Sequence, residues 1–352
     1  MKVTSVVTGP LTSRFAGICL SVSASLMLTP VAVGAADFTS VQVGYQRQAQ
    51  VGTWMPVHVS ADGLSPGQSV SLAMTAPDPR GNPVVRICGT NEADSEGRVV
   101  LAGLGRTGRT DGTLQIELVE TDGSASICST SIRCSEQRLL KAAGPIQRRL
   151  RLYRHNVRFM LTIGQPAGID TLLSQAAKIS PDTPLVVGVS IPAGELLPRS
   201  SQDYDMFSTI VFTGNVELDE QQFIALKSWI HAGGNLIVSL TDQLEDFLAT
   251  PLGKWLHARF DISTEMRQVT DVDLGALQQI VPRATRISTN RRRVRMAQLR
   301  DKQPLRLAES SNGSLVGRLS CGGGQVTVVS LDLSKTPLSQ WNSLADFYAV
   351  LM

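Results

Sequence analysis

The stretch YDMFSTIVFTGNVELDEQQFIALKSWIHAGGNLIVSLTDQ (residues 204–243) decides the fold of this chain. Residues 207–212 form an apolar, β-branched run that is typical of a buried strand, and the turn residues 213–215 end it. Residues 236–240 form a second run of the same kind. The segment between them predicts a helix, because it begins with acidic residues and ends in two glycines. Its apolar side chains recur at three- and four-residue spacing: Phe223, Ile224, Leu226, Trp229 and Ile230.

Two apolar strands joined by one amphipathic helix predict a right-handed βαβ unit, and therefore a parallel sheet. The same alternation begins upstream and continues downstream of this unit. We expect strands at residues 159–163, 185–189, 294–299, 305–308, 315–319 and 325–331. We expect helices or helical turns at residues 169–177, 244–256, 274–280 and 341–351.

The part of the chain before this alternation has the pattern of a β-sandwich. Seven short strand-like runs are separated by turns rich in glycine, proline and aspartate. They lie at residues 41–45, 54–59, 70–74, 84–87, 98–101, 113–119 and 126–132. The sequence therefore predicts an antiparallel β-sandwich domain at 36–157, an α/β domain at 158–335 and a C-terminal helix at 336–352.

Composition limits the possible functions only broadly. The 352 residues suffice for two or three domains, and 42% hydrophobic and 18% charged residues are ordinary for a globular protein. The net charge of +3 falls to +1 when Lys2 and Arg14 of the expected leader are removed. This balance indicates neither nucleic acid nor an anionic membrane surface as a partner.

Residues 1–35 have the pattern of a secretory signal peptide. Lys2 and Arg14 supply the positive charge, residues 15–28 form the apolar core, and small or compact residues precede a cleavage site near Ala35. We therefore expect export to the periplasm or cell envelope. The alternative is an uncleaved leader that keeps the protein associated with the membrane.

Four cysteines follow the leader, namely Cys88, Cys128, Cys134 and Cys321. In an oxidising compartment a disulfide is expected, and Cys128 and Cys134 are close enough in sequence for a hairpin bridge. Cys88 is the other candidate partner, and buried free thiols are the alternative. The spacing fits no zinc site.

A basic cluster lies at residues 146–158. Its members are Arg148, Arg149, Arg151, Arg154, His155 and Arg158. One interpretation is a patch for anions or lipid headgroups. We favour the other, an edge strand that connects two domains and carries solvated arginines, since no aromatic residues interleave with them.

The α/β region resembles the class I glutamine-amidotransferase-like domain, in the version found in exported or membrane-anchored bacterial envelope proteins. The resemblance rests on the quoted stretch, with WIHAGGNLIV at 229–238, and on GGGQVTVVSLD at 322–332, followed by Pro337 and Trp341. Upstream, GY at 44–45 and GTWMPV at 52–57 match as well. The resemblance implies a flavodoxin-like, mostly parallel sheet with flanking helices.

The chain departs from this family where active members carry their catalytic groups. Active amidotransferases place a cysteine in a glycine-flanked elbow after a strand, and a histidine and a glutamate follow later. Here the corresponding strand ends VSLTDQ at 238–243, without cysteine or glycine, and no His-x-Glu pair occurs. We interpret Ser239 as a core residue, Cys321 as a hairpin-turn thiol and His231 as a charge in the last turn of a helix.

A ligand of such a sheet is expected at the carboxyl ends of its parallel strands. We call this the carboxyl edge. Its candidate residues are Gly164, Gln165, Thr213, Gly214, Asn215, Thr241, Asp242 and Gln243. They can bind a ligand, but they include no strong base, metal cage or phosphate loop, so we expect neither catalysis, nor a metal, nor a cofactor.

The sequence thus predicts a non-catalytic, exported envelope protein that acts as a binding or assembly module. Its expected partners are other envelope or membrane proteins and not nucleic acid, and the sequence identifies no small-molecule ligand. One alternative is a hydrolase or amidotransferase with a non-standard site at the carboxyl edge. Another is a module that contacts glycan or peptidoglycan through Trp54 and Tyr45 of the β-sandwich.

Overall fold

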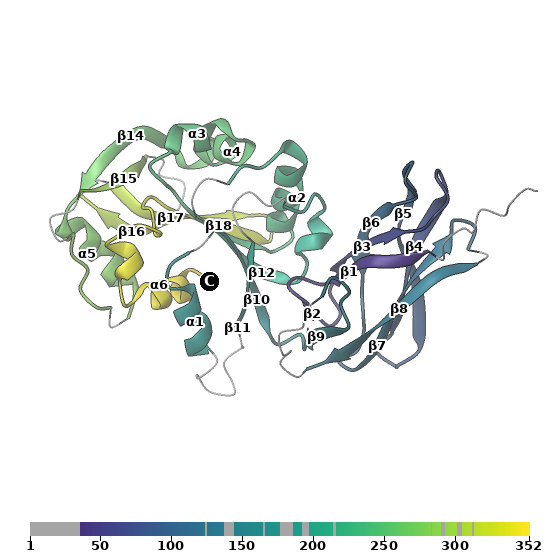
Figure 1. The fold of residues 1–352 in the computed structure, drawn as a ribbon. Helices are drawn as coiled ribbons and strands as arrows, with labels where there is room; N and C mark the ends of the chain where they lie inside the picture. The colour runs from purple at the N-terminus through teal and green to yellow at the C-terminus, as the bar shows by residue number, and fades with distance from the viewer. Residues whose placement is uncertain are drawn as a thin grey trace, which may run out of the picture.

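The computed structural model describes residues 36–123, 125–136, 144–164, 166–176, 186–191, 197–213, 216–282, 284–289, 293–300, 305–311 and 313–352. The expected leader lies outside these residues. The protein is a mixed α/β protein with more strand than helix, and its strands form three sheets in the described residues. Figure 1 shows the N-terminal strands on one side and the larger region with helices on the other. No helix among these residues is both long and apolar enough to cross a membrane.

Two of the sheets form the N-terminal part of the chain. One has the order β1 (Asp37–Val43), β3 (Met55–Asp62), β6 (Val99–Gly105). The other has the order β2 (Gln48–Gln50), β9 (Arg149–Tyr153), β8 (Ser126–Ser135), β7 (Gly112–Glu120), β4 (Ser69–Pro77), β5 (Pro83–Glu92). Both sheets contribute alternate apolar side chains to one shared core. We call this the two-sheet region. The seven strands expected here are confirmed, but the sheets are not purely antiparallel as expected, because β9 pairs in parallel with β8 and with β2.

The basic segment forms a strand, but not an edge strand as expected. β9 pairs with β8 on one side and with the short strand β2 on the other. Its leucines Leu150 and Leu152 are buried in the shared core, whereas Arg149 next to them is exposed. The prediction failed because β2 has only three residues and no recognisable strand pattern of its own.

The third sheet has nine strands and forms the C-terminal region. Its parallel part has the order β11 (Val186–Ile191), β10 (Arg158–Ile163), β12 (Phe207–Thr213), β13 (Asn235–Ser239), β18 (Gly324–Val329). Antiparallel strands then follow: β17 (Gly313–Cys321), β15 (Val294–Leu299) and β14 (Ile262–Val269), with β16 (Leu305–Ser310) paired to β17.

The predicted βαβ unit is confirmed. β12 and β13 are neighbouring parallel strands joined by α2 (Glu220–His231), with Val211 opposite Ile237. Asp219 caps α2 by accepting the backbone N–H of Gln222, whose side chain bonds back to the N–H of Asp219. At the other end the indole N–H of Trp229 donates to the carbonyl of Phe207, which fastens the helix to the sheet.

Helices cover both faces of this sheet. On one face α2, α3 (Leu244–Ala249) and α4 (Pro251–Phe260) pack against inward residues such as Leu236 and Val238. On the other face α1 (Ile169–Ala176), α5 (Asp271–Ile280) and α6 (Leu344–Leu351) pack against residues such as Ile237. Burial on both faces explains the continuous apolar runs that revealed these strands in the sequence.

Two details differ from the expected elements. Residues 244–256 form two helices, because Thr250 caps a new helix that begins at Pro251. The strand β14 was not anticipated, since its sequence ISTEMRQV is mostly polar and lies at an edge of the sheet.

The two-sheet region and the C-terminal region meet through a small set of direct contacts. The hydroxyl of Tyr45 donates to the carbonyl oxygen of Asp203 at 2.9 Å, and its ring centroid lies 4.8 Å from that of Phe207. The backbone N–H of Trp54 donates to the Asp205 carboxylate at 3.1 Å, and the side-chain amide of Gln46 donates to the Ser190 carbonyl at 2.8 Å. We call this boundary the junction.

Candidate functional site

The described residues of the carboxyl edge do lie at one end of the sheet. Ile163, which precedes Gly164, is opposite Phe212, and Thr213 is opposite Ser239 at the end of β13. Gly164 has a φ of +89° and donates its N–H to the Ile191 carbonyl. Gln165, Gly214 and Asn215 lie outside the described residues, and so does the side chain of Thr213.

The charged group of the carboxyl edge is held in an ion pair. The Asp242 carboxylate accepts from the Lys335 ammonium at 2.6 Å, and Asp332 lies 3.6 Å from the same ammonium. These interactions raise the pKa of Lys335, the hydrogen bond to Asp242 contributing most. Thr241 is nearly buried, and Gln243 is exposed at the start of α3. The edge therefore presents an ion pair that links two loops.

Ser239 is buried and fully engaged with the backbone. Its hydroxyl donates to the Leu331 carbonyl at 2.9 Å and accepts the Leu333 N–H at 2.9 Å. Only 2% of the residue is exposed. These two bonds tie the end of β13 to the chain that follows β18, which is the role of a structural core residue.

Cys321 and His231 lie near each other, but away from the carboxyl edge. Cys321 is buried at the β17–β18 hairpin, opposite Gly324, and burial raises the pKa of its thiol. The hairpin approaches the end of α2 closely, where the Gly323 N–H donates to the His231 carbonyl at 2.9 Å. A thiol with a raised pKa is a poor nucleophile at neutral pH.

The predicted disulfide between Cys128 and Cys134 is wrong. Both residues lie on the single strand β8, paired with Leu118 and Gly112 of β7, and the cysteines are free. Six residues of extended chain span about 20 Å, whereas a disulfide requires Cα atoms within about 7 Å. The alternative of free thiols is what the structure contains, and burial raises their pKa values to about 11 for Cys128 and about 12 for Cys134.

A cleft of about 500 Å³ at the junction is a second candidate site, which the sequence did not predict. It lies where the two-sheet region meets the loop before β12. Its walls combine aromatic, apolar, basic and acidic groups. They include Trp54, His58, Arg86, Ile87, Gln202 and Asp203.

The cleft brings an aromatic face and opposite charges together. The guanidinium of Arg86 lies 5.4 Å from the ring centroid of Trp54, in a cation–π arrangement. Burial raises the pKa of the Asp203 carboxyl, and a hydrogen bond from the Ser200 backbone, followed by the nearby His58, partly offsets this effect. Cys88 also lines the cleft, but burial raises the pKa of its thiol to about 11. The arrangement is suited to binding a ligand that has both an apolar face and polar groups.

No local pattern could have revealed this cleft. Its residues come from β3, β5, β6 and the loop before β12, so the fold alone brings them together. The one usable signal was Trp54, an aromatic residue beside a predicted turn. Among the residues that the structure describes, no group of three or more His, Cys, Asp or Glu side chains is arranged to hold a metal ion.

Comparisons with known proteins provide no family for this chain. No model of a protein family matches it, and no curated protein does. The cytoplasmic protein STM1381 of Salmonella typhimurium LT2 is 14% identical over 55% of this chain and 98% of its own, with a TM-score of 0.38. The cytoplasmic protein STM3548 of Salmonella typhimurium is 9% identical over 55% of this chain and 97% of its own, with a TM-score of 0.39.

An enzyme is among the solved structures that align with part of the chain. The exo-beta-1,4-mannosidase Op5Man5 of Opitutaceae bacterium strain TAV5 is 16% identical over 55% of this chain and 35% of its own, with a TM-score of 0.33. TM-scores of this size establish no shared function.

Proposed function

We propose that this chain is a non-catalytic, exported binding or assembly module of the bacterial cell envelope, built on a class I glutamine-amidotransferase-like domain. The order of its parallel strands supports this assignment. When β10, β11, β12, β13 and β18 are numbered along the chain, their spatial order is 2-1-3-4-5, which is the flavodoxin-like order. The expected partners are other envelope or membrane proteins.

The proposal that the chain is non-catalytic rests on the hydrogen bonds of the Ser239 hydroxyl. Ser239 ends the strand after which active members of the family place their nucleophile. Its hydroxyl is occupied by the backbone of Leu331 and Leu333, and the nearby acid Asp242 is paired with Lys335. A nucleophile needs a base within hydrogen-bond reach, whereas these groups serve to connect loops.

The experiment is labelling of the folded protein with a fluorophosphonate and with an iodoacetamide probe. We expect no fluorophosphonate labelling, and iodoacetamide labelling of Cys321 only after unfolding in urea, because the thiol is buried. The Ser239→Ala and Cys321→Ala variants serve as controls. Labelling of the folded wild type that either variant abolishes would contradict the proposal.

The junction cleft favours a second candidate function, contact with a glycan. Trp54 is half-buried in this cleft, whereas the other three tryptophans of the chain are buried in cores. An indole face can stack against the apolar face of a sugar ring, while Asp203, Gln202 and Arg86 offer hydrogen bonds to its hydroxyl groups. Tyr45, the other candidate aromatic, is instead part of the junction.

Calorimetric titration with a peptidoglycan disaccharide peptide tests this second function. We expect the Trp54→Ala variant to bind about tenfold more weakly, because it lacks the aromatic face. The matched variant Trp54→Phe keeps that face and should stay within a few-fold of the wild type. Equal binding by Trp54→Ala, or no binding by the wild type, would exclude a glycan site in the cleft.

A further inference from the structure

Strand register places two arginines side by side on the outer face of the two-sheet region. Arg133 of β8 is the direct partner of Arg149 of β9, and on its other side Arg133 is opposite Thr113 of β7. The residues next to both arginines, such as Ile132 and Leu150, point into the core. The two guanidinium groups therefore project from the same face, on strands about 4.8 Å apart.

These arginines line a hollow of about 320 Å³, together with Arg148, Thr113 and Ser131. All five side chains are exposed. Three guanidinium groups and two hydroxyls thus surround one hollow. We call this set the arginine hollow.

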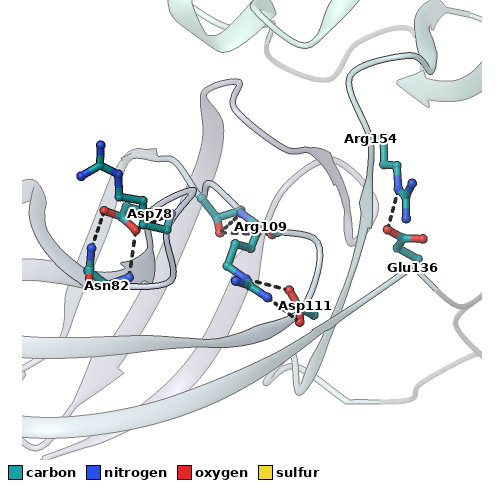
Figure 2. Close-up of polar contacts among 8 residues, drawn as sticks. Asp78, Asn82, Arg109, Asp111, Glu136 and Arg154 are labelled. Carbon is teal, nitrogen blue, oxygen red and sulfur yellow. Dashed lines mark hydrogen bonds and ion pairs between the residues drawn. The ribbon is translucent and has the colours of Figure 1, made fainter.

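The positive charge of the arginine hollow is not neutralised by neighbouring acids. In the part of the chain that the structure describes, no carboxylate lies within ion-pair distance of these three arginines. Two acids close in sequence to residues of the hollow have other partners (Figure 2): the Asp111 carboxylate lies 2.9 Å from the Arg109 guanidinium, and the Glu136 carboxylate lies 3.0 Å from the Arg154 guanidinium. Like charges at this spacing repel one another, so a bound anion would stabilise the cluster.

We propose that the arginine hollow binds the phosphate group of an anionic ligand. Guanidinium groups form paired hydrogen bonds with phosphate oxygens, and a phosphate has more acceptor oxygens and more charge than a carboxylate. The donors of three guanidinium groups and two hydroxyl groups suit the oxygens of a phosphate, which outnumber those of a carboxylate. This site lies apart from the junction cleft and does not depend on the function proposed above.

The sequence predicted that the arginines of the basic segment are solvated. In the structure they fall into two groups with different neighbours. Arg154 is paired with Glu136, and Arg151 lies 4.5 Å from the ring centroid of Tyr153. Arg148 and Arg149 instead join Arg133, which is distant in sequence. The phosphate can belong to a lipid headgroup or to a free phosphate ester, since both present the same oxygens.

The test compares the wild-type protein with an Arg133→Gln/Arg149→Gln double variant. One arm measures sedimentation with vesicles of equal parts phosphatidylglycerol and phosphatidylcholine, and with phosphatidylcholine alone. The other arm titrates inorganic phosphate by calorimetry, with acetate as the carboxylate control. The Arg293→Gln/Arg295→Gln variant is the matched control, because it removes two exposed arginines from the C-terminal region.

We expect the double variant to bind about 30-fold more weakly than the wild type in at least one arm, and the matched control to bind normally. Binding of phosphatidylglycerol vesicles alone indicates a lipid headgroup, and binding of inorganic phosphate as well indicates a free phosphate site. The proposal is overturned if the wild type binds neither the phosphatidylglycerol vesicles nor inorganic phosphate, if both double variants lose binding equally, or if acetate binds as tightly as phosphate. Circular dichroism confirms that each variant is folded.

Discussion

The two regions of this molecule use their polar groups in opposite ways. In the C-terminal sheet the groups at the carboxyl edge are bound to one another: Ser239 to the backbone of the following loop, and Asp242 to Lys335. In the two-sheet region Trp54 and Arg133 face a cleft and a hollow with accessible donors. The comparison teaches that polar groups at the carboxyl edge are engaged within the fold, whereas Trp54 and Arg133 of the two-sheet region line open surfaces.

The largest expected effect comes from cavities in the separate cores of the two regions. Leu236→Ala and Leu72→Ala each remove a side chain that is 0% exposed. Each should lower the free energy of unfolding by about 2–5 kcal/mol. Because the cores are separate, calorimetry should show two transitions, with Leu72→Ala shifting one and Leu236→Ala the other.

Exposed positions give the control for this pair. Ile224→Ala and Val100→Ala, at residues 54% and 66% exposed, should change stability by less than about 0.5 kcal/mol. One cooperative transition, shifted equally by both core variants, would show that the regions fold as one unit.

A smaller effect distinguishes structural from accessible hydroxyls. Ser239→Ala leaves the Leu333 N–H and the Leu331 carbonyl without their buried partner, and should cost about 1–3 kcal/mol in urea unfolding. Ser131→Ala in the arginine hollow removes an exposed hydroxyl and should cost less than about 0.5 kcal/mol. If Ser239→Ala leaves the free energy of unfolding unchanged, the contrast between engaged hydroxyls in the C-terminal region and accessible ones in the two-sheet region is wrong.

Sequence reasoning succeeded where burial dictates the residue pattern. The runs around Ile210 and Ile237 are apolar because helices cover both faces of the sheet, so their period and length indicated β12 and β13. Strands of the two-sheet region such as β3 and β7 were found for a related reason, since their side chains alternate between the shared core and the surface. β14 was missed because an edge strand with solvated side chains carries little of this signal.

The sites were harder to predict, because they depend on register and on distant segments. The disulfide prediction assumed a hairpin between Cys128 and Cys134, whereas both belong to one long strand. The pairing of Arg133 with Arg149 depends on the register of β8 with β9, which no local pattern encodes. Trp54 and Asp203 likewise meet only through the packing of the two regions.

The smallest expected effect concerns the pH dependence of the junction. Burial raises the pKa of Asp203 above its value in the unfolded chain, so the protonated carboxyl favours the folded state. That contribution is present below the unfolded pKa and is lost as the pH rises through the folded pKa. The amide introduced by Asp203→Asn cannot ionise. Between acid and neutral pH, the free energy of unfolding of this variant should therefore rise by about 0.3 kcal/mol relative to that of the wild type. The effect is small because solvent screens this half-buried carboxyl.

The opposite sign is expected at the start of α2, which makes Asp219→Asn the control. The N–H of Gln222, followed by Arg199, lowers the pKa of Asp219. Its contribution to stability is therefore present at neutral pH and is lost as the pH falls through the folded pKa. Urea unfolding at a series of pH values measures the free energy of unfolding of each variant. As the pH rises, Asp203→Asn should become more stable relative to the wild type, and Asp219→Asn should become less stable relative to it. If the Asp203→Asn and wild-type curves stay parallel, the junction does not hold this carboxyl away from water, and the cleft would be an open surface that offers no buried charge to a ligand.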